Sequence, residues 1–336
     1  MAVNECPFGP FPAAREAVAA QLAGLHRYPG RDDELIARLA AIHGLDPDRI
    51  ALGNGADAII GYVSQALLRP GDEVLTGWPS FATYLIDAEK AGATAVTVAL
   101  TDDGAFDLPA MAQRISPATR LIWVCTPNNP MGAAVGRDAL ADFLDAVPED
   151  VLVVVDEAYF EYAAGPDHAD AIAEHVLTRP NVAALRTFSK LYGLAALRIG
   201  WLAGPPALAA RLREIRHYYD VTDLAVAAAL ASLDDPAEVA RRRTANDEQR
   251  ARLQAAFDAL GLAHLPSQTN FVTVDVGDAV AVAARLEARG ILVRALDGVG
   301  TPALLRVTVG APDEVERFLA ELTGALGLLA TVDADR

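Results

Sequence analysis

The feature that most constrains the fold is an alternation of short apolar runs with longer helical patterns. It extends from about residue 32 to residue 233. The runs are rich in β-branched residues and have the length of buried strands, whereas the segments between them have the length of helices. Such an alternation predicts a mostly parallel sheet covered by helices. The seven candidate strands are 49–52, 73–76, 95–99, 121–126, 151–155, 182–186 and 198–202.

One helix is predicted clearly at residues 32–43. Its apolar side chains follow helical spacing, as Leu35 and Leu39 illustrate. Asp32 is expected to cap its start, and Gly44 stands just past its end, where a left-handed residue commonly stops a helix.

A second block follows residue 234 and differs in pattern. It consists of a long charged helix (237–260), a strand (270–274), a helix (278–289) and two strands (291–294 and 304–308). This order predicts a smaller α+β unit. We expect a large domain at 25–234 and a small domain formed by 1–24 and 235–336.

The charge balance argues against nucleic acid or a membrane surface as a partner. The 336 residues include 28 Lys and Arg against 45 Asp and Glu, a formal net charge of −17, which repels phosphate backbones and anionic lipids. No stretch is apolar over the roughly eighteen residues that a membrane helix needs, and no export signal opens the chain. The two cysteines, Cys6 and Cys125, form neither a disulfide framework nor a metal-ligand spacing. We expect a cytoplasmic protein with a small-molecule partner and no metal.

Asp156 is the first candidate for chemistry. The strand predicted at 151–155 runs directly into Asp156 and Glu157. Ligands of open α/β sheets bind beyond the carboxyl ends of the strands, so Asp156 is placed where a ligand would meet it. A carboxylate buried there needs a cationic partner. The alternative is that Asp156 only caps the next segment, and the strand alone favours that alternative.

Lys190 is the second candidate, in the segment Thr187-Phe188-Ser189-Lys190 after another apolar strand. A lysine in a crowded, partly desolvated turn can act as an amine nucleophile toward an aldehyde. Arg198 follows eight residues later in an apolar strand, where it needs an anion to compensate its charge. Most lysines are simply solvated, and the spacing to Arg198 is what favours a functional role.

Two loops at carboxyl ends of predicted strands complete the set. The turn Gly53-Asn54-Gly55 leads into a helix predicted at 56–68, whose N-terminal N–H groups can bind phosphate. It is not the dinucleotide fingerprint, because the third glycine is missing. In the loop 126–132, prolines on both sides could aim an asparagine amide, of Asn128 or Asn129, rigidly at a ligand oxygen. Both segments are also ordinary turn sequences.

In this order the motifs resemble the fold-type I, pyridoxal-phosphate-dependent aminotransferases, and among them the histidinol-phosphate aminotransferase branch. The resemblance extends from residue 3 to about residue 319. Further signatures are the segments 3–10, 27–29, 79–84 and 305–310. The family's fold implies a large cofactor-binding α/β domain with a mostly parallel seven-stranded sheet and a smaller α+β domain.

The resemblance also implies a role for each motif residue. Lys190 would hold pyridoxal 5′-phosphate as a Schiff base and move the substrate proton, and Asp156 would pair with the pyridine nitrogen. Asn129 and Tyr159 would hydrogen-bond the phenolic oxygen, while Phe81 would stack on the ring. The residues implied for the phosphate are Gly55, Ala56, Asp57, Thr187, Ser189 and Arg198, with Tyr28 reaching in from the second subunit of a homodimer.

For the substrate, the resemblance implies that Arg306, with Arg294 nearby, grips an anionic group. Asn129 and Tyr28 would contribute to the same pocket. Asp220 lies in a loop, 217–222, where relatives usually carry an amide. An acid there would favour a cationic substrate group, and the alternative is that it is simply solvated. The first choice of reaction is ping-pong transamination between histidinol phosphate and 2-oxoglutarate.

Three alternatives remain open. An aromatic or other amino acid could be the donor. A decarboxylase of the threonine-phosphate type shares the fold and most motifs, and release of carbon dioxide without a keto acid would identify it. A non-catalytic binding module or sensor is the third, although the acidic balance opposes a DNA-binding role.

Overall fold

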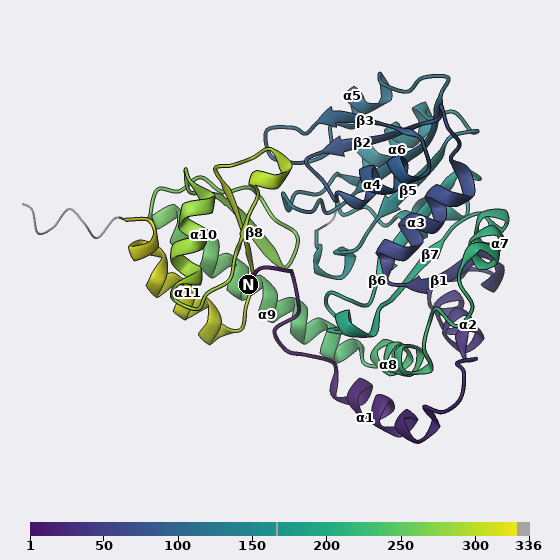
Figure 1. The fold of residues 1–336 in the computed structure, drawn as a ribbon, viewed down its shortest axis with the longest axis horizontal. Coiled ribbons are helices and arrows are strands. Elements are labelled where there is room, and N and C mark those ends of the chain that lie inside the picture. Colours follow the sequence, from purple (N-terminus) through teal and green to yellow (C-terminus); the bar gives the residue numbers. More distant parts are fainter. Residues whose placement is uncertain (166, 328–336) are drawn as a thin grey trace, which may run out of the picture.

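The computed structural model describes residues 1–165 and 167–327, which form two sheets with separate buried cores (Figure 1). The larger sheet has the order β1-β7-β6-β5-β4-β2-β3. Only β7 runs antiparallel to its neighbours, so the expected mostly parallel, seven-stranded sheet is confirmed. Its strands are β1 (Ile50–Asn54), β2 (Glu73–Trp78), β3 (Thr94–Ala99), β4 (Thr119–Cys125), β5 (Leu152–Asp156), β6 (Val182–Thr187) and β7 (Ile199–Ala203).

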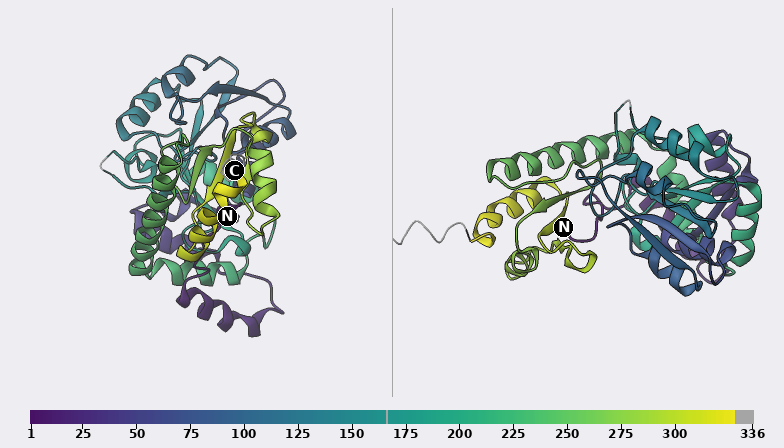
Figure 2. Two further views of the ribbon diagram at one scale, coloured as in Figure 1. Left: turned by 90° about the vertical axis from the view of Figure 1, so that its left-hand side faces the viewer. Right: turned by 90° about the horizontal axis from the view of Figure 1, so that it is seen from above.

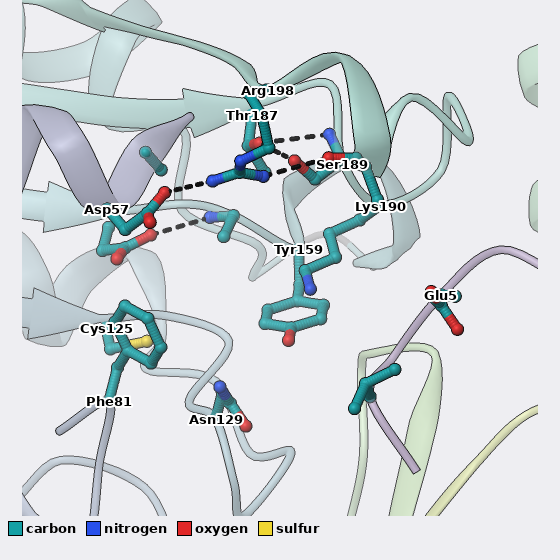
Figure 3. Close-up of a pocket in the computed structure, with 15 residues that line it drawn as sticks. Glu5, Asp57, Phe81, Cys125, Asn129, Tyr159, Thr187, Ser189, Lys190 and Arg198 are labelled. Carbon is teal, nitrogen blue, oxygen red and sulfur yellow. Dashed lines mark hydrogen bonds and ion pairs between the residues drawn. The ribbon is translucent and has the colours of Figure 1, made fainter. Parts of the chain in front are cut away.

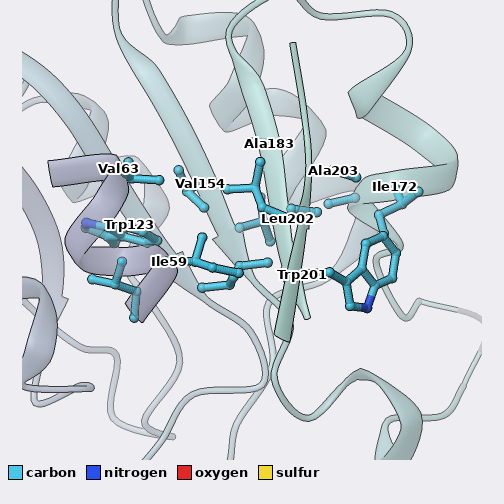
Figure 4. Close-up of a cluster of buried hydrophobic side chains, with 14 of the residues drawn as sticks. Ile59, Val63, Trp123, Val154, Ile172, Ala183, Trp201, Leu202 and Ala203 are labelled. Carbon is cyan, nitrogen blue, oxygen red and sulfur yellow. The ribbon is translucent and has the colours of Figure 1, made fainter. Parts of the chain in front are cut away.

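Helices pack against this sheet because its central strands are apolar on both faces. Every residue of β6 and β7 is buried, which an open sheet achieves only when both faces are covered. Figure 4 shows Ile59 and Val63 of α3 packed near Val154 and Leu202. The helices of this part are α1 (Pro12–Gln21), α2 (Asp32–His43), α3 (Ala56–Leu67), α4 (Thr83–Lys90), α5 (Leu108–Ala112), α6 (Arg137–Ala146), α7 (Pro206–Ile215) and α8 (Asp223–Leu233).

The bounds of α2 agree with the pattern in the sequence, but its predicted cap is wrong. Gly44 ends the helix with φ 64°, as expected. Asp32 is the first helical residue rather than the cap, and no side chain caps this end. Its carboxylate is bound instead by the Arg216 guanidinium, because α2 begins beside the end of α7.

The smaller sheet has the order β8-β10-β9 and is antiparallel. Its core includes Phe257 and Phe318, and α9 runs from the larger part of the molecule into this one (Figures 1 and 2). The expected α+β unit is therefore present, with a third strand of only two residues. Its elements are α9 (Pro236–Ala259), β8 (Phe271–Asp275), α10 (Ala279–Glu287), β9 (Arg294–Ala295), β10 (Leu304–Thr308) and α11 (Pro312–Ala325).

The N-terminal segment contacts both parts of the molecule. The first residues do reach the smaller sheet, since the Thr308 N–H donates to the Met1 carbonyl over 2.9 Å. In contrast, Phe11 and Ala14 are buried in the larger core, and α1 packs against α8 (Figure 1). The domain boundaries at 24 and 234 stay a prediction, and residues 328–336 lie outside the described chain.

No helix in the described ranges has the length and apolar character needed to cross a membrane.

Candidate active site

The cavity of interest lies at the carboxyl edge of the larger sheet (Figure 3). Strands β1, β4, β5 and β6 are parallel, so the residues that follow them meet at one edge. Because β7 is antiparallel, Arg198 just before its start reaches the same edge. The cavity has a volume of about 340 Å³. The predicted residues that line it are Ala56, Asp57, Phe81, Asn129, Asp156, Tyr159, Thr187, Ser189, Lys190 and Arg198.

Asp156 forms the polar floor of the cavity at the end of β5. It is buried, and both carboxylate oxygens are bound: Oδ1 accepts from the Ala158 N–H at 3.0 Å and Oδ2 from the Tyr84 hydroxyl at 2.5 Å. Burial raises the pKa of Asp156, while the Tyr84 hydroxyl, the Ala158 N–H and the charge of Lys190 oppose that rise. A carboxylate in this position is suited to a cationic group in the cavity.

Lys190 lies in the same cavity as Asp156, in the turn after β6. Its Nζ atom is 5.6 Å from the centroid of the Tyr159 ring. Tyr159 is buried, its ring packs edge-on against Phe271, and its hydroxyl accepts a hydrogen bond from Asn4 Nδ2 at 2.9 Å. Since the hydroxyl already accepts from Asn4, its own proton is available to an acceptor in the cavity.

An anion-binding cradle forms where α3 begins. Gly55 precedes the helix with φ 83° and ψ 165°, a conformation that is essentially restricted to glycine. The first N–H groups of α3 point out of the helix, and Arg198 reaches them and pairs with the Asp57 carboxylate. On the opposite side, the Thr187 and Ser189 hydroxyls are 2.9 Å apart. Backbone N–H groups, two hydroxyls and a guanidinium are the donors that a phosphate group requires.

Asn129 and Arg306 connect the two sheets next to the cavity. Arg306 of β10 donates from Nη1 to Asn129 Oδ1 at 2.5 Å and from Nη2 to the Ala2 carbonyl at 2.9 Å. It is 9% exposed, and burial lowers its pKa. Its Nε–H has no partner within 1–165 and 167–327. A buried guanidinium with an unused donor is suited to an anionic ligand group.

Four predicted residues lie outside the cavity lining, besides Arg306. Gly55 stands immediately behind it. Tyr28 is 78% exposed and stacks on Tyr219 at the surface, with ring centroids 4.4 Å apart. Arg294 is exposed, and its backbone lies opposite that of Arg306 in the antiparallel pair of β9 and β10. Asp220 accepts from the Asn54 N–H at 3.0 Å and from the Tyr62 hydroxyl at 2.8 Å, and it does not line the cavity.

Several residues contribute to the site in ways that the motifs did not indicate. The cavity is also lined by Val3, Glu5 and Cys125. Cys125 is opposite Asp156 in the β4–β5 register, so both strand ends reach the cavity together. The unexpected role of Asn4 is its bond to Tyr159, and Asn4 has a positive φ of 57°.

The site can be compared with known proteins once this geometry is established. Residues 1–322 match the model of the aminotransferase class I and II family. The chain belongs to this family. The family and the fold inferred from the motifs are therefore confirmed, and the aminotransferase fold accounts for the convergence of four strand ends on one cavity.

The sequence of this aminotransferase is similar to those of known relatives over most of its length. It is 44% identical over 327 residues to histidinol-phosphate aminotransferase 2 of Pseudomonas aeruginosa, with 96% of this chain and 87% of the relative covered. It is 42% identical over 318 residues to an aromatic amino acid aminotransferase of Thermobifida fusca, with 94% and 87% covered. The crystal structure of histidinol-phosphate aminotransferase from Sinorhizobium meliloti with pyridoxal-5′-phosphate has a TM-score of 0.92 and 30% identity, with 98% and 90% covered.

Proposed function

We propose that this aminotransferase uses pyridoxal 5′-phosphate to move an amino group from a donor, first of all histidinol phosphate, to 2-oxoglutarate. The observation that carries the proposal is the presence of Lys190, Asp156 and the anion-binding cradle around one cavity. The Sinorhizobium relative, with 30% identity, binds this cofactor in its crystal structure, which supports the same cofactor here.

The donor set of the cavity fits each polar part of the cofactor. Asp156 is a buried carboxylate that would bind the protonated pyridine nitrogen. Tyr159 and Asn129 would bind the phenolic oxygen, and Phe81 would cover a face of the ring. The phosphate would occupy the cradle, where the Arg198 guanidinium offsets the repulsion between the phosphate and Asp57.

When bound, the cofactor supplies an aldehyde that combines with amines and a ring that accepts electrons from the bond broken at the substrate Cα. The residues of this chain supply the remaining functions. Lys190 would provide the amine that holds the cofactor and would serve as the base that takes and returns the proton at the substrate Cα. Asp156 would place a carboxylate opposite the ring nitrogen, and the buried Tyr159, whose hydroxyl accepts from Asn4, would donate its proton to the phenolic oxygen.

The anionic end of the donor is assigned to Arg306. Its unused Nε–H and the neighbouring Arg294 give this side of the site two positive charges, which suits a phosphate or a carboxylate. The Pseudomonas relative is named for histidinol phosphate, which makes that donor the first choice. An aromatic amino acid is the second candidate, because the Thermobifida relative of similar identity is named for such donors.

A half-reaction screen tests the choice of donor. Purified protein loaded with the cofactor is mixed with one amino donor at a time, and loss of the aldehyde form is followed by its absorbance. Histidinol phosphate is expected to convert the cofactor faster than phenylalanine, tyrosine, lysine or aspartate at equal concentration. Fastest conversion with an aromatic donor would select the second candidate, and carbon dioxide release without a keto acid would select the decarboxylase alternative.

We also propose that the active form is a homodimer in which Tyr28 serves the cavity of the partner subunit. Tyr28, Leu22 and Leu25 are large apolar side chains that are more than half exposed, and Tyr218 is 92% exposed. Exposed apolar groups gathered in this way are typical of an interaction surface. Since Tyr28 does not line the cavity of its own chain, a second copy is needed to bring it there.

Mixed dimers test this arrangement. Lys190→Arg and Tyr28→Phe each reduce activity in a pure dimer. After mixing and subunit exchange, a hybrid has one site with both substitutions and one site with neither, so activity is expected to recover. No recovery despite demonstrated exchange would show that Tyr28 does not act across the interface.

The location we propose is the cytoplasm. The two free cysteines are consistent with its reducing conditions, and cell fractionation would check it.

A further inference from the structure

Tyr84 is a buried side chain that touches two cavity-lining residues without lining the cavity itself. It lies in α4 and is fully buried. Its hydroxyl donates to Asp156 Oδ2 at 2.5 Å. Its ring stacks on Trp123 with centroids 4.8 Å apart and an interplanar angle of 8°. The same ring meets Phe81 edge-on, with centroids 5.8 Å apart and an angle of 80°.

The direction of the Tyr84 hydrogen bond follows from its surroundings. Burial raises the pKa of Tyr84 well above its ordinary value, and the charge of Asp156 adds to that rise. Burial likewise raises the pKa of the Cys125 thiol, to about 12. A carboxyl group is ordinarily far more acidic than a thiol or a phenol, so among these three groups Tyr84 is the donor and Asp156 the acceptor. The Ala158 N–H holds the other carboxylate oxygen at 3.0 Å.

Two neutral donors therefore fix the plane of the Asp156 carboxylate, one on each oxygen. The Ala158 N–H belongs to the backbone just after β5 and moves with Asp156. The Tyr84 hydroxyl comes from a separate element, 72 residues away in sequence. The Tyr84 ring stacks on Trp123 of β4. The Tyr84 hydroxyl therefore holds the Asp156 carboxylate in a fixed position relative to the buried core of the sheet.

We propose that Tyr84 is a positioning residue for the aminotransferase reaction, holding the Asp156 carboxylate and the Phe81 ring where they meet the pyridine ring of the cofactor. This inference rests on the proposed function. Tyr84 touches neither substrate nor cofactor and acts through Asp156 and Phe81.

Removal of the Tyr84 hydroxyl should weaken the interaction of the Asp156 carboxylate with the pyridine nitrogen of the cofactor. The carboxylate would lose one of its two neutral donors and become harder to ionise in its buried place. The titratable groups that face it would then be Cys125 from β4 and Lys190 from the turn after β6. Tyr84→Phe keeps the ring and both aromatic contacts, so it removes the donor alone.

The test compares Y84F with a matched control, Y162F. Tyr162 is also buried, at 2% exposed, but it does not line the cavity. Three quantities are measured: the dissociation constant of pyridoxal phosphate for the apoprotein, the visible spectrum of the bound cofactor across pH, and the melting temperature. Y84F is expected to bind the cofactor roughly 10- to 100-fold more weakly, as loss of a hydrogen bond to a charged group implies. The pH at which its spectrum changes should also differ from wild type, whereas Y162F should leave both quantities unchanged.

A double-substitution cycle separates positioning from general packing. In the Asp156→Asn background, Y84F should cause less than a threefold further loss of cofactor affinity, because the charged acceptor is gone. If Y84F accumulates poorly, both cofactor measurements are made on its soluble, folded fraction, and the same losses are expected there.

Wild-type affinity and spectrum in Y84F, or an equal loss in the Asp156→Asn background, would overturn the role of Tyr84. Failure of the wild-type protein to bind the cofactor at all would instead overturn the proposed function.

Discussion

Alanine in place of Gly55 is the sharpest single test of the anion-binding cradle. Gly55 has φ 83° and ψ 165°, a region that side chains other than glycine enter at a cost of about 1–3 kcal/mol. A Cβ atom at this position would overlap Arg198 Nη2 and lie 2.6 Å from Asp57 Oδ1. Both side chains would have to move, and the guanidinium would leave the start of α3.

The expected loss of cofactor affinity follows from that displacement. Moving Arg198 and the first turn of α3 removes at least one charge-assisted hydrogen bond to the phosphate, worth about 1.5–3 kcal/mol. We therefore expect G55A to raise the dissociation constant of pyridoxal phosphate roughly 10- to 100-fold. Titration of the apoprotein, followed by cofactor absorbance, gives this constant.

A matched control separates the cradle from backbone strain. Gly71 also has a positive φ, 97°, but no atom lies within 4 Å of the place where its Cβ would be. G71A should lower the melting temperature as strain requires and leave cofactor affinity unchanged. If G55A binds the cofactor as tightly as wild type, the phosphate does not occupy the start of α3.

Three further predictions concern separate parts of the structure. Arg306→Lys should raise KM for an anionic donor about 10-fold or more and also lower the melting temperature, because lysine cannot reproduce the buried guanidinium contacts to Asn129 and Ala2; steady-state kinetics would check it, and an unchanged KM would contradict it. Asp220→Ala should lower the free energy of unfolding by about 1–3 kcal/mol, since the Asn54 N–H loses its acceptor, and leave the ranking of amino donors unchanged in the half-reaction screen. Burial lowers the pKa of His43 from 6.5 to about 4. As the pH falls from 6.5 to about 4, His43 is therefore protonated in the unfolded chain but still neutral in the folded one, which favours unfolding. Stability should then fall by about 1–2 kcal/mol, after allowance for its partial exposure, and His43→Phe should flatten that dependence in denaturant titrations.

Much of the fold could be predicted from the sequence because the central strands are short, nearly continuous runs of apolar residues. The segments that became β5 and β6 are apolar at nearly every position, so their length and burial follow from local sequence. The placement of Asp156 at the carboxyl edge follows from the same pattern. The antiparallel direction of β7 does not, because strand direction depends on how the chain returns after Lys190.

The contacts that local sequence could not predict join distant segments. Asp220 accepts from the Asn54 N–H and the Tyr62 hydroxyl and does not line the cavity, and its contribution to the substrate pocket stays a prediction. Asp32 was expected to cap α2, but Arg216 binds its carboxylate. No local pattern encodes these pairs, because each joins residues more than 150 positions apart.

The central claim is that Lys190 carries the cofactor, and the composition of the chain makes one measurement decisive. The sequence has only two lysines, Lys90 and Lys190. The Lys90 side chain is 71% exposed, pairs with Asp87 and does not line the cavity, so it serves as an internal control. Borohydride treatment of the loaded protein should fix the pyridoxyl group on the Lys190 peptide, as seen by mass spectrometry, and Lys90→Arg should behave as wild type. Modification of Lys90 or the N-terminal amine instead, or a reducible band that persists in Lys190→Arg, would contradict the account.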